Sequence, residues 1–196
     1  ADICYEALLE AKKRNITVSC DLNFRKKLWS KEKAGQVMGK LCAYIDYCIA
    51  NEEDAKDVFG IEADNTDIYS GKLNREGYIS VAKQLTERFN FKGVAITLRE
   101  SKSANDNDWS GMLYTGGEAY FSKKYSMHIV DRVGGGDSFG GGLIYSLLSG
   151  KSSQEAIEFA VAASALKHTI PGDMILVTRA EVDNLVGGDG SGRVSR

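Results

Sequence analysis

The chain has little of several residue types that would point to a particular class of protein. It contains one proline, two histidines and four cysteines in 196 residues, and no two cysteines form a C-x-x-C pair. Metal and redox sites are therefore poorly supported, and we expect reduced, packed thiols in a reducing compartment. The chain also lacks an apolar run long enough to span a membrane, and no secretory signal precedes its first expected helix. We therefore expect a cytoplasmic protein without a membrane partner.

Neither sign of charge dominates. Lys and Arg number 25, Asp and Glu number 27, and the net charge is −2. Because no basic stripe is interleaved with aromatic residues, nucleic acid is not expected as a partner. A hydrophobic fraction of 43% without a charged tail argues against disorder. We expect residues 1–186 to belong to one domain and the glycine-rich residues 187–196 to form a mobile tail, and the sequence leaves a homo-oligomer open.

Helical and extended patterns alternate along the first half of the chain. Apolar residues recur at helical spacing up to about residue 14, and further helices are predicted over about 31–43 and 74–89. Each helix is followed by a run typical of a buried strand, namely ITVSCDLN, YCIAN and GVAITL. Three such helix-to-strand steps predict a parallel sheet in an α/β layer fold.

The pattern changes in the second half of the chain. The pair Gly116-Gly117 separates two apolar and aromatic runs, which predicts a β-hairpin and an antiparallel sheet edge. A helix is expected to begin in the glycine stretch that follows and to end at Gly150. Ser152 and Glu155 then have the spacing of a capping box for a long helix.

The stretch DRVGGGDSFGGG, residues 131–142, places three glycines directly before Asp137. A strand, a glycine turn and a helix N-terminus expose backbone N–H groups and the positive end of the helix dipole, which together favour a bound phosphate. Glycine is needed where the backbone takes positive φ angles or approaches phosphate oxygens closely. A carboxylate beside such a site suits proton removal from a hydroxyl that is being phosphorylated. The alternative is a tight turn, with Asp137 as a helix cap and Gly140 to Gly142 at a close helix contact.

Two other phosphate-binding motifs are excluded. A dinucleotide-binding G-x-G-x-x-G pattern fails because Phe139 takes the place of its third glycine. The letters GKS at 150–152 match the end of a Walker A motif, but Tyr145 stands where the first glycine of that motif belongs.

Together with two other segments, the glycine stretch resembles the ribokinase-like (PfkB) sugar kinases. Every fixed position of their D-x-x-G-x-G-D-x-F signature is met, by Asp131, Gly134, Gly136, Asp137 and Phe139. DLNFRKKLW at 21–29 is similar to the D-x-N-x-R-x-x-L-W element of 2-keto-3-deoxygluconate kinases, and NEED at 51–54 is similar to the family's N-x-x-E element. The resemblance implies a ribokinase-like three-layer α/β/α fold with a mostly parallel sheet and a β-hairpin at its edge.

The resemblance also implies a reaction. Asp137 would take the proton of a sugar hydroxyl, while Gly134, Gly135 and Gly136 would supply the N–H groups of an anion hole. The implied reaction is ATP-dependent phosphorylation of a sugar acid, with 2-keto-3-deoxygluconate and its 6-phosphate as the favoured pair. Two alternatives stay open: another PfkB sugar kinase, such as a fructokinase, and a non-catalytic nucleotide-binding module. Because family members are longer, we expect the N-terminal strands and lid to be missing, so that this chain alone could lack activity.

Three residues are implied at the substrate. The Arg25 guanidinium suits the carboxylate of a keto-sugar acid, and Asn23 would face substrate or nucleotide. Asp173, in the IPGD segment, would line the site together with Asp137. The alternatives are a solvated surface charge for Arg25 and a helix cap for Asp173.

The NEED segment is implied to hold Mg²⁺ through water, because this ion dehydrates reluctantly. Asn51 and Asp54 match the element, but Asp54 replaces the family's glutamate, so Glu53 or Glu52 could take its place. The alternative is a helix N-terminus rich in acids.

The resemblance places the nucleotide near the segment TLRES. Arg99 and Ser101 of this segment would bind it, although Arg99 stands where many members of the family have glycine. Arg99 would either pair with a phosphate or cover the surface. K⁺ near Asp131 is a further cofactor that the resemblance leaves open.

Overall fold

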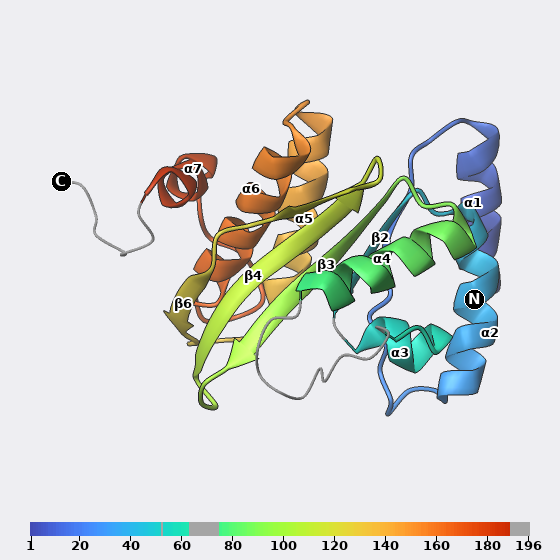
Figure 1. Cartoon of the computed structure of the whole chain (residues 1–196), viewed down its shortest axis with the longest axis horizontal. Coiled ribbons are helices and arrows are strands. Elements are labelled where there is room, and N and C mark those ends of the chain that lie inside the picture. The colour runs from blue at the N-terminus through green and yellow to red at the C-terminus, as the bar shows by residue number, and fades with distance from the viewer. Residues whose placement is uncertain (52, 63–74, 189–196) are drawn as a thin grey trace. The chain divides into compact units, whose positions relative to one another are not determined.

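A computed structural model describes residues 1–51, 53–62 and 75–188 of the chain (Figure 1). These residues form two compact units. The first contains described residues from 1–62, 75–96 and 114–119, and the second contains residues 97–113 and 120–188. Residues 189–196 of the predicted mobile tail lie outside the described residues, so the tail and the domain over residues 1–186 stay predictions.

The first unit joins helices to short strands, as the sequence predicts. Its helices are α1 (Asp2–Lys13), α2 (Lys31–Leu41), α3 (Asp54–Phe59) and α4 (Arg75–Phe89), with a 3₁₀ turn η1 at Cys42–Tyr44. Strands β1 (Ser19–Asp21) and β2 (Tyr47–Asn51) pair in parallel. The three predicted helices and the parallel pairing are confirmed, although the expected first residue of the third helix, Asn74, lies outside the described residues. The short helix α3 begins at Asp54 with Asp54 and Asp57 in its first turn, which agrees with the alternative interpretation of the NEED segment as a helix N-terminus rich in acids.

A buried carboxylate joins the segments around β2 in this unit. Asp46 is 6% exposed, accepts a hydrogen bond from the Val18 backbone N–H and pairs with Lys92 at 2.9 Å. Burial alone would raise the pKa of Asp46, but the bonds from Val18 and Lys92 hold it below its ordinary value. A buried charge is tolerated because it is both paired and hydrogen-bonded.

The sheet continues through strands that contribute residues to both units. Its order is β1-β2-β3-β4-β5, with β6 also paired to β4, where β3 is Gly93–Ser101, β4 is Asp106–Thr115, β5 is Glu118–Phe121 and β6 is Tyr125–His128. Strands β4 and β6 are antiparallel, with Asp106 opposite His128. The predicted hairpin is confirmed between β4 and β5, where Gly116 and Gly117 have φ angles of 61° and 85°.

The second unit packs two helices against β4. These are α5 (Gly135–Leu148) and α6 (Ser153–Lys167), which run side by side (Figure 1), and α7 (Arg179–Gly187) follows them. A Cβ atom on Gly111 of β4 would meet side chains of both helices, namely those of Phe139, Ile157 and Val161. The predicted capping box is present, because the Ser152 side chain accepts from the Glu155 N–H and the Glu155 side chain accepts from the Ser152 N–H.

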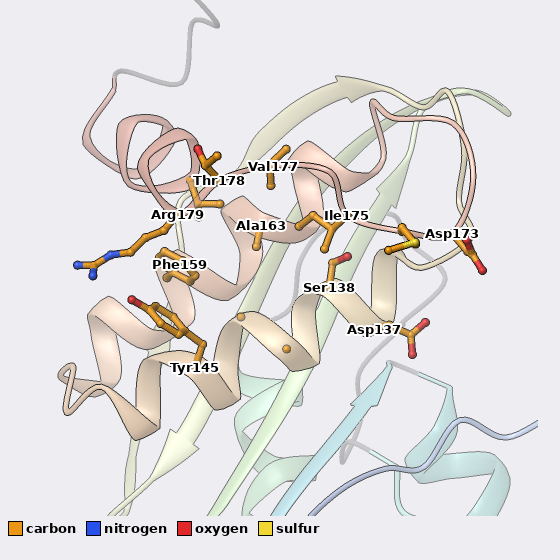
Figure 2. Close-up of a pocket in the computed structure, with 14 residues that line it drawn as sticks. Asp137, Ser138, Tyr145, Phe159, Ala163, Asp173, Ile175, Val177, Thr178 and Arg179 are labelled. Atoms are coloured by element: carbon orange, nitrogen blue, oxygen red, sulfur yellow. The ribbon is translucent and has the colours of Figure 1, made fainter.

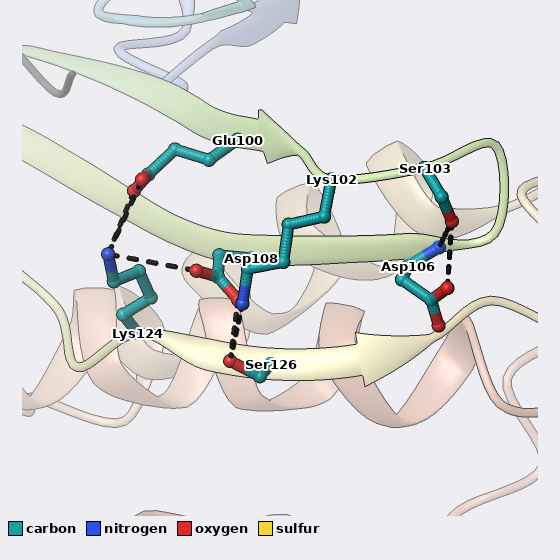
Figure 3. A network of polar contacts seen from close by, with 7 residues as sticks. All are labelled: Glu100, Lys102, Ser103, Asp106, Asp108, Lys124 and Ser126. Atoms are coloured by element: carbon teal, nitrogen blue, oxygen red, sulfur yellow. Dashed lines mark hydrogen bonds and ion pairs between the residues drawn. The ribbon is translucent and has the colours of Figure 1, made fainter. Parts of the chain in front are cut away.

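A polar network joins β3, β4 and the start of β6 in the second unit. Figure 3 shows Asp108 between Lys102, Lys124 and Ser126, with Lys124 also reaching Glu100. Asp108 is 6% exposed. Burial alone would raise its pKa, but the hydrogen bonds from Lys102 and Ser126 hold the pKa of Asp108 below its ordinary value.

All four cysteines are free. Cys42 and Cys48 are buried, and burial raises the pKa of the Cys42 thiol to about 12. The expectation of packed thiols is confirmed for these two and is wrong for Cys4, which is exposed because α1 buries none of its residues. Across residues 1–51, 53–62 and 75–188, no helix is both long and apolar enough to cross a membrane.

Candidate active site

The loop before α5 is fixed by one carboxylate. Asp131 accepts a hydrogen bond of 3.0 Å from the Val133 N–H and one of 2.8 Å from the Gly172 N–H. These bonds hold the pKa of Asp131 below its ordinary value. Gly134 ends the loop as the N-cap of α5 in a left-handed conformation, with φ at 77°. The first acid of the glycine stretch therefore shapes the backbone that leads to Asp137.

The three glycines before Asp137 have different surroundings. A Cβ atom on Gly134 would lie 2.0 Å from the carbonyl oxygen of Asp173, and one on Gly135 would lie 2.5 Å from Cε1 of His168. A Cβ atom on Gly136 would meet nothing within 4 Å. Close packing thus excludes side chains at the first two positions, whereas the third glycine borders open space.

The same loop offers backbone donors to an anion. The Gly135 N–H donates to the Arg132 carbonyl at 3.2 Å, so this donor is already used within the loop. Within the described part of the chain, the N–H groups of Gly134, Gly136 and Asp137 have no hydrogen-bond partner. Unpaired N–H groups at the first turn of a helix, beside open space at Gly136, suit a phosphate. The tight turn of the alternative interpretation is present, but it leaves these N–H groups without hydrogen-bond acceptors.

Asp137 lies in the first turn of α5 and is exposed. It lines a cavity of about 460 Å³ formed by α5, α6, α7 and the segment between α6 and α7. Figure 2 shows Asp137 and Asp173 at one end of this cavity, with Tyr145 and Phe159 at the other. Asp173 is not a helix cap, since Thr178 caps α7 through a capping box with Glu181. That alternative for Asp173 is wrong, and the two carboxylates share one end of the cavity.

The two residues predicted on TLRES lie on β3 of the same unit. Arg99 is exposed, and its charge is among the influences that lower the pKa of His168, after burial of that ring. The Ser101 hydroxyl donates to the side-chain oxygen of the buried Asn107 at 3.0 Å. The side chains of Arg99 and Ser101 are therefore both accessible to a ligand.

The DLNFR segment belongs to the first unit and follows β1. Asn23 has a positive φ of 41°, and its N–H donates to the Asp21 side chain at 2.9 Å. Asparagine tolerates this conformation better than most residues, because its short polar side chain bonds locally. The neighbouring Phe24 is buried, while the side chain of Arg25 is exposed. The local turn therefore presents Asn23 and Arg25 to solvent.

Asp54 ties the DLNFR segment to the NEED segment. Its Oδ1 accepts from the Phe24 N–H at 3.4 Å and its Oδ2 from the Asn51 N–H at 3.1 Å. The Asn51 side chain in turn accepts from the N–H of Asp54 at 3.0 Å. Asp54 is 4% exposed, and burial raises its pKa. This carboxylate has a clear structural task, which the sequence did not predict.

Glu53 is the accessible acid of the NEED segment. Its side chain is 70% exposed and lies 3.8 Å from the Lys26 ammonium. Glu52 lies outside the described residues. In the part of the chain that the structure covers, no group of three or more His, Cys, Asp or Glu side chains could hold a metal ion by itself. Mg²⁺ commonly binds through one or two carboxylates together with substrate phosphates, so the acids here suit a shared ion only.

The predicted residues thus fall into two sets. The set in the second unit consists of Arg99, Ser101, Gly134, Gly135, Gly136, Asp137 and Asp173, and the set in the first unit consists of Asn23, Arg25, Asn51, Glu53 and Asp54. Within the second unit, the structure brings Asp137 and Asp173 to one cavity and packs Gly134 against Asp173. Within the first unit it joins Asn51 and Asp54 through hydrogen bonds.

Sequence reasoning missed the residues that support the glycine loop from beneath. The hydroxyl of buried Ser164 donates to the Gly135 carbonyl at 2.8 Å, and the His168 ring stands where a Gly135 side chain would be. Lys167 is fully buried next to them. The signal available was a lysine at the end of a mostly apolar segment, AIEFAVAASALK, although such a residue is more often exposed.

Comparison with known proteins relates this chain to carbohydrate kinases. The pattern of the pfkB family carbohydrate kinases matches residues 1–179. The 2-dehydro-3-deoxygalactonokinase of Haloferax volcanii is 28% identical over 95% of this chain and 52% of its own length. The chain therefore spans about half the length of this relative.

Solved structures show the same fold. The 2-dehydro-3-deoxygluconokinase of Thermotoga maritima is 50% identical, with a TM-score of 0.87 over 93% of this chain and 54% of that one. Aminoimidazole riboside kinase from Salmonella enterica, solved with its riboside and an ATP analogue, is 19% identical, with a TM-score of 0.69 over 94% of this chain and 57% of that one. The predicted ribokinase-like α/β fold is confirmed. The chain belongs to the pfkB family of carbohydrate kinases.

Proposed function

We propose that the whole protein transfers a phosphoryl group from ATP to a hydroxyl of a sugar acid, with 2-keto-3-deoxygluconate giving its 6-phosphate. The observation that carries this proposal is the pairing of an exposed Asp137 with the unpaired N–H groups of Gly134 and Gly136 at the start of α5. A phosphate-binding site needs only the donors. The carboxylate beside them suits a second reactant that must lose a proton.

In this proposal Asp137 acts as the general base, and the glycine loop before it acts as the anion hole. As the substrate oxygen attacks, the Asp137 carboxylate accepts its proton, so that the oxygen reacts as the better nucleophile. The N–H groups of Gly134 and Gly136 point their partial positive charge at the transferring group, and the α5 dipole adds to it. Gly135 differs from our expectation, because its N–H is already bonded to Arg132 and its role is to pack against His168.

ATP and Mg²⁺ are the proposed cofactors. ATP supplies the phosphoryl group and Mg²⁺ neutralises charge on its phosphates. The open space at Gly136 and the unpaired donors fit a phosphate end, and Arg99 and Ser101 are accessible to the rest of a nucleotide. Glu53 is the proposed acid for Mg²⁺, while Asn51 and Asp54 shape its segment through the hydrogen bonds between them.

Arg25 is the proposed reader of the acid group. Its guanidinium is exposed, and the backbone before it is held by hydrogen bonds that the Asn23 and Phe24 N–H groups donate to the Asp21 and Asp54 carboxylates. A fixed guanidinium can form two parallel hydrogen bonds to a carboxylate, which neutral sugars lack. Asn23 and Asp173 are the proposed hydroxyl-binding groups, since their side chains are exposed.

The proposal is tested by the release of ADP from Mg-ATP by the whole protein. Comparing 2-keto-3-deoxygluconate, fructose and ribose at equal concentrations, we expect kcat/KM to be highest for the sugar acid. A charged hydrogen-bonded contact that neutral sugars cannot make is worth about 1.5–3 kcal/mol, or about 10–150-fold. A higher kcat/KM for fructose or ribose would mean that the substrate is a neutral sugar and not a sugar acid. No ADP release with any of the three would favour a nucleotide-binding module.

A further inference from the structure

Lys167, the last residue of α6, is fully buried, with an exposed fraction of 0%. Removing an ammonium group from water is costly unless it is paired and hydrogen-bonded, so lysine is almost never buried to this extent. Its Nζ donates a hydrogen bond of 3.0 Å to the carbonyl oxygen of Ile170. No carboxylate among the described residues lies within ion-pair distance of it. The proposed catalytic chemistry leaves this charge unexplained.

The ammonium lies between two loops that meet under the glycines. The N–H groups of Val130 and Asp131 donate to the His168 carbonyl at 2.8 and 3.2 Å, and the Gly172 N–H donates to Asp131. Lys167 Cε would lie 3.3 Å from a Cβ atom on Gly134, so the side chain passes directly below the loop. Lys167 is also among the charges that attract the Asp131 carboxylate.

We propose that the Lys167 ammonium is a built-in monovalent cation, which holds the glycine loop in its phosphate-binding form and makes a bound K⁺ unnecessary there. An ammonium group and K⁺ carry the same charge and are of similar size, and backbone carbonyl oxygens satisfy either of them. The covalent tether keeps the cation in place at any salt concentration. Its contribution to phosphate binding rests on the proposed kinase function, whereas its role in holding the two loops does not.

Thermal unfolding of the protein in choline, lithium, ammonium and potassium chloride at equal ionic strength tests the proposal without any need for turnover. We expect the wild-type Tm to be the same in all four salts. Lys167→Ala removes the ammonium and leaves room for an ion, and we expect it to lower Tm by about 4–10 °C in choline chloride. Potassium or ammonium should restore much of that loss, while lithium, which is much smaller, should not.

Two results would overturn the proposal: a wild-type Tm that rises selectively with potassium, or a Tm of the Lys167→Ala variant that is lowered equally in every salt.

If Lys167→Ala proves insoluble, Lys167→Met carries the test, because it keeps the chain length and fills the space. It should be less stable than wild type and insensitive to potassium. Stability equal to wild type would contradict a need for the charge. Lys124→Ala is the matched control, since Lys124 is half-exposed on the same unit and pairs with Glu100.

Inorganic phosphate, added in the same experiment, separates this inference from the kinase function. A ligand that binds only the folded state raises Tm by mass action. We expect phosphate to raise the wild-type Tm in choline chloride and to raise that of Lys167→Ala only with potassium or ammonium present. Restoration by potassium without any phosphate effect would support the built-in cation and count against the phosphate site.

Discussion

The glycines before Asp137 are surrounded so differently that their substitutions should fail for different reasons. Gly136→Ala places its methyl group in open space, so we expect the free energy of unfolding to stay equal or rise by up to about 1 kcal/mol. The methyl group would still stand where a phosphate must approach, so kcat/KM should fall about 10²-fold. Denaturant unfolding and ADP release measure the two effects.

Gly135→Ala is the matched variant. Its methyl group would meet the buried His168 ring, which Ser164 holds through a hydrogen bond of 2.7 Å, so we expect a loss of about 1–3 kcal/mol in the free energy of unfolding. Equal stability of the two variants would contradict the assignment of Gly135 to packing and Gly136 to the ligand.

Asp131 should make the loop sensitive to acid. Its folded-state pKa is lowered by the bonds from Val133 and Gly172, so its contribution to stability is present above the ordinary pKa of about 3.9 and is lost as pH falls through the lower folded value. Asp131→Asn should therefore be less stable than wild type at pH 7, and the two should converge as the pH falls below the lowered folded-state pKa of Asp131. Urea unfolding at several pH values measures this. A constant difference at all pH values would speak against the carboxylate.

Local motifs and distant packing explain why some site residues were predictable and others were not. Asp137 and Gly134 stand in a short pattern whose chemistry can be read directly, and the structure places Gly134 at a positive φ. Lys167 and Ser164 act only because α6 packs beside α5, a contact between distant parts of the sequence. The buried role of Asp54 likewise depends on Phe24, which is 30 residues away.

The close contact between α5 and α6 depends on Gly142, the last glycine of residues 140–142. A Cβ atom on Gly142 would lie 3.0 Å from the Ala160 Cα, whereas one on Gly141 would meet nothing within 4 Å. Gly142→Ala should therefore push the helices apart and lower the free energy of unfolding by about 1–3 kcal/mol. Gly141→Ala should raise it by up to about 1 kcal/mol. Thermal or urea unfolding of the pair checks this, and a stabilised Gly142→Ala variant would refute the close contact.

Helices and strands were predictable where turn or cap residues next to them in the sequence mark their ends. Gly116-Gly117 marked a hairpin, and Ser152 with Glu155 marked a helix start, because turn and cap residues act through neighbours in the chain. The turn between β3 and β4, residues 102–105, was missed because it contains neither glycine nor proline. The strand β6 was missed because its pairing to β4 is supplied only by the fold.

For the chain as a whole, the fold class was predictable, whereas the predicted site residues fall in two units. Three helix-to-strand steps predicted the α/β class, and the parallel pairing of β1 with β2 agrees. The chain spans about half the length of the relatives that it matches. Burial and hydrogen bonding of Asp54 show that matching a motif position and touching a ligand are separate properties.

Turnover by Asp137→Asn tests the account most directly. The whole protein and this variant would be compared for ADP release with 2-keto-3-deoxygluconate, and ATP binding would be measured in parallel. We expect kcat to fall by about 10²–10⁴-fold with ATP affinity retained, because the exposed side chain keeps its shape and loses only the capacity to accept a proton. Unchanged turnover in the variant would contradict the role of Asp137 as the base, and with it the proposed reaction at the start of α5.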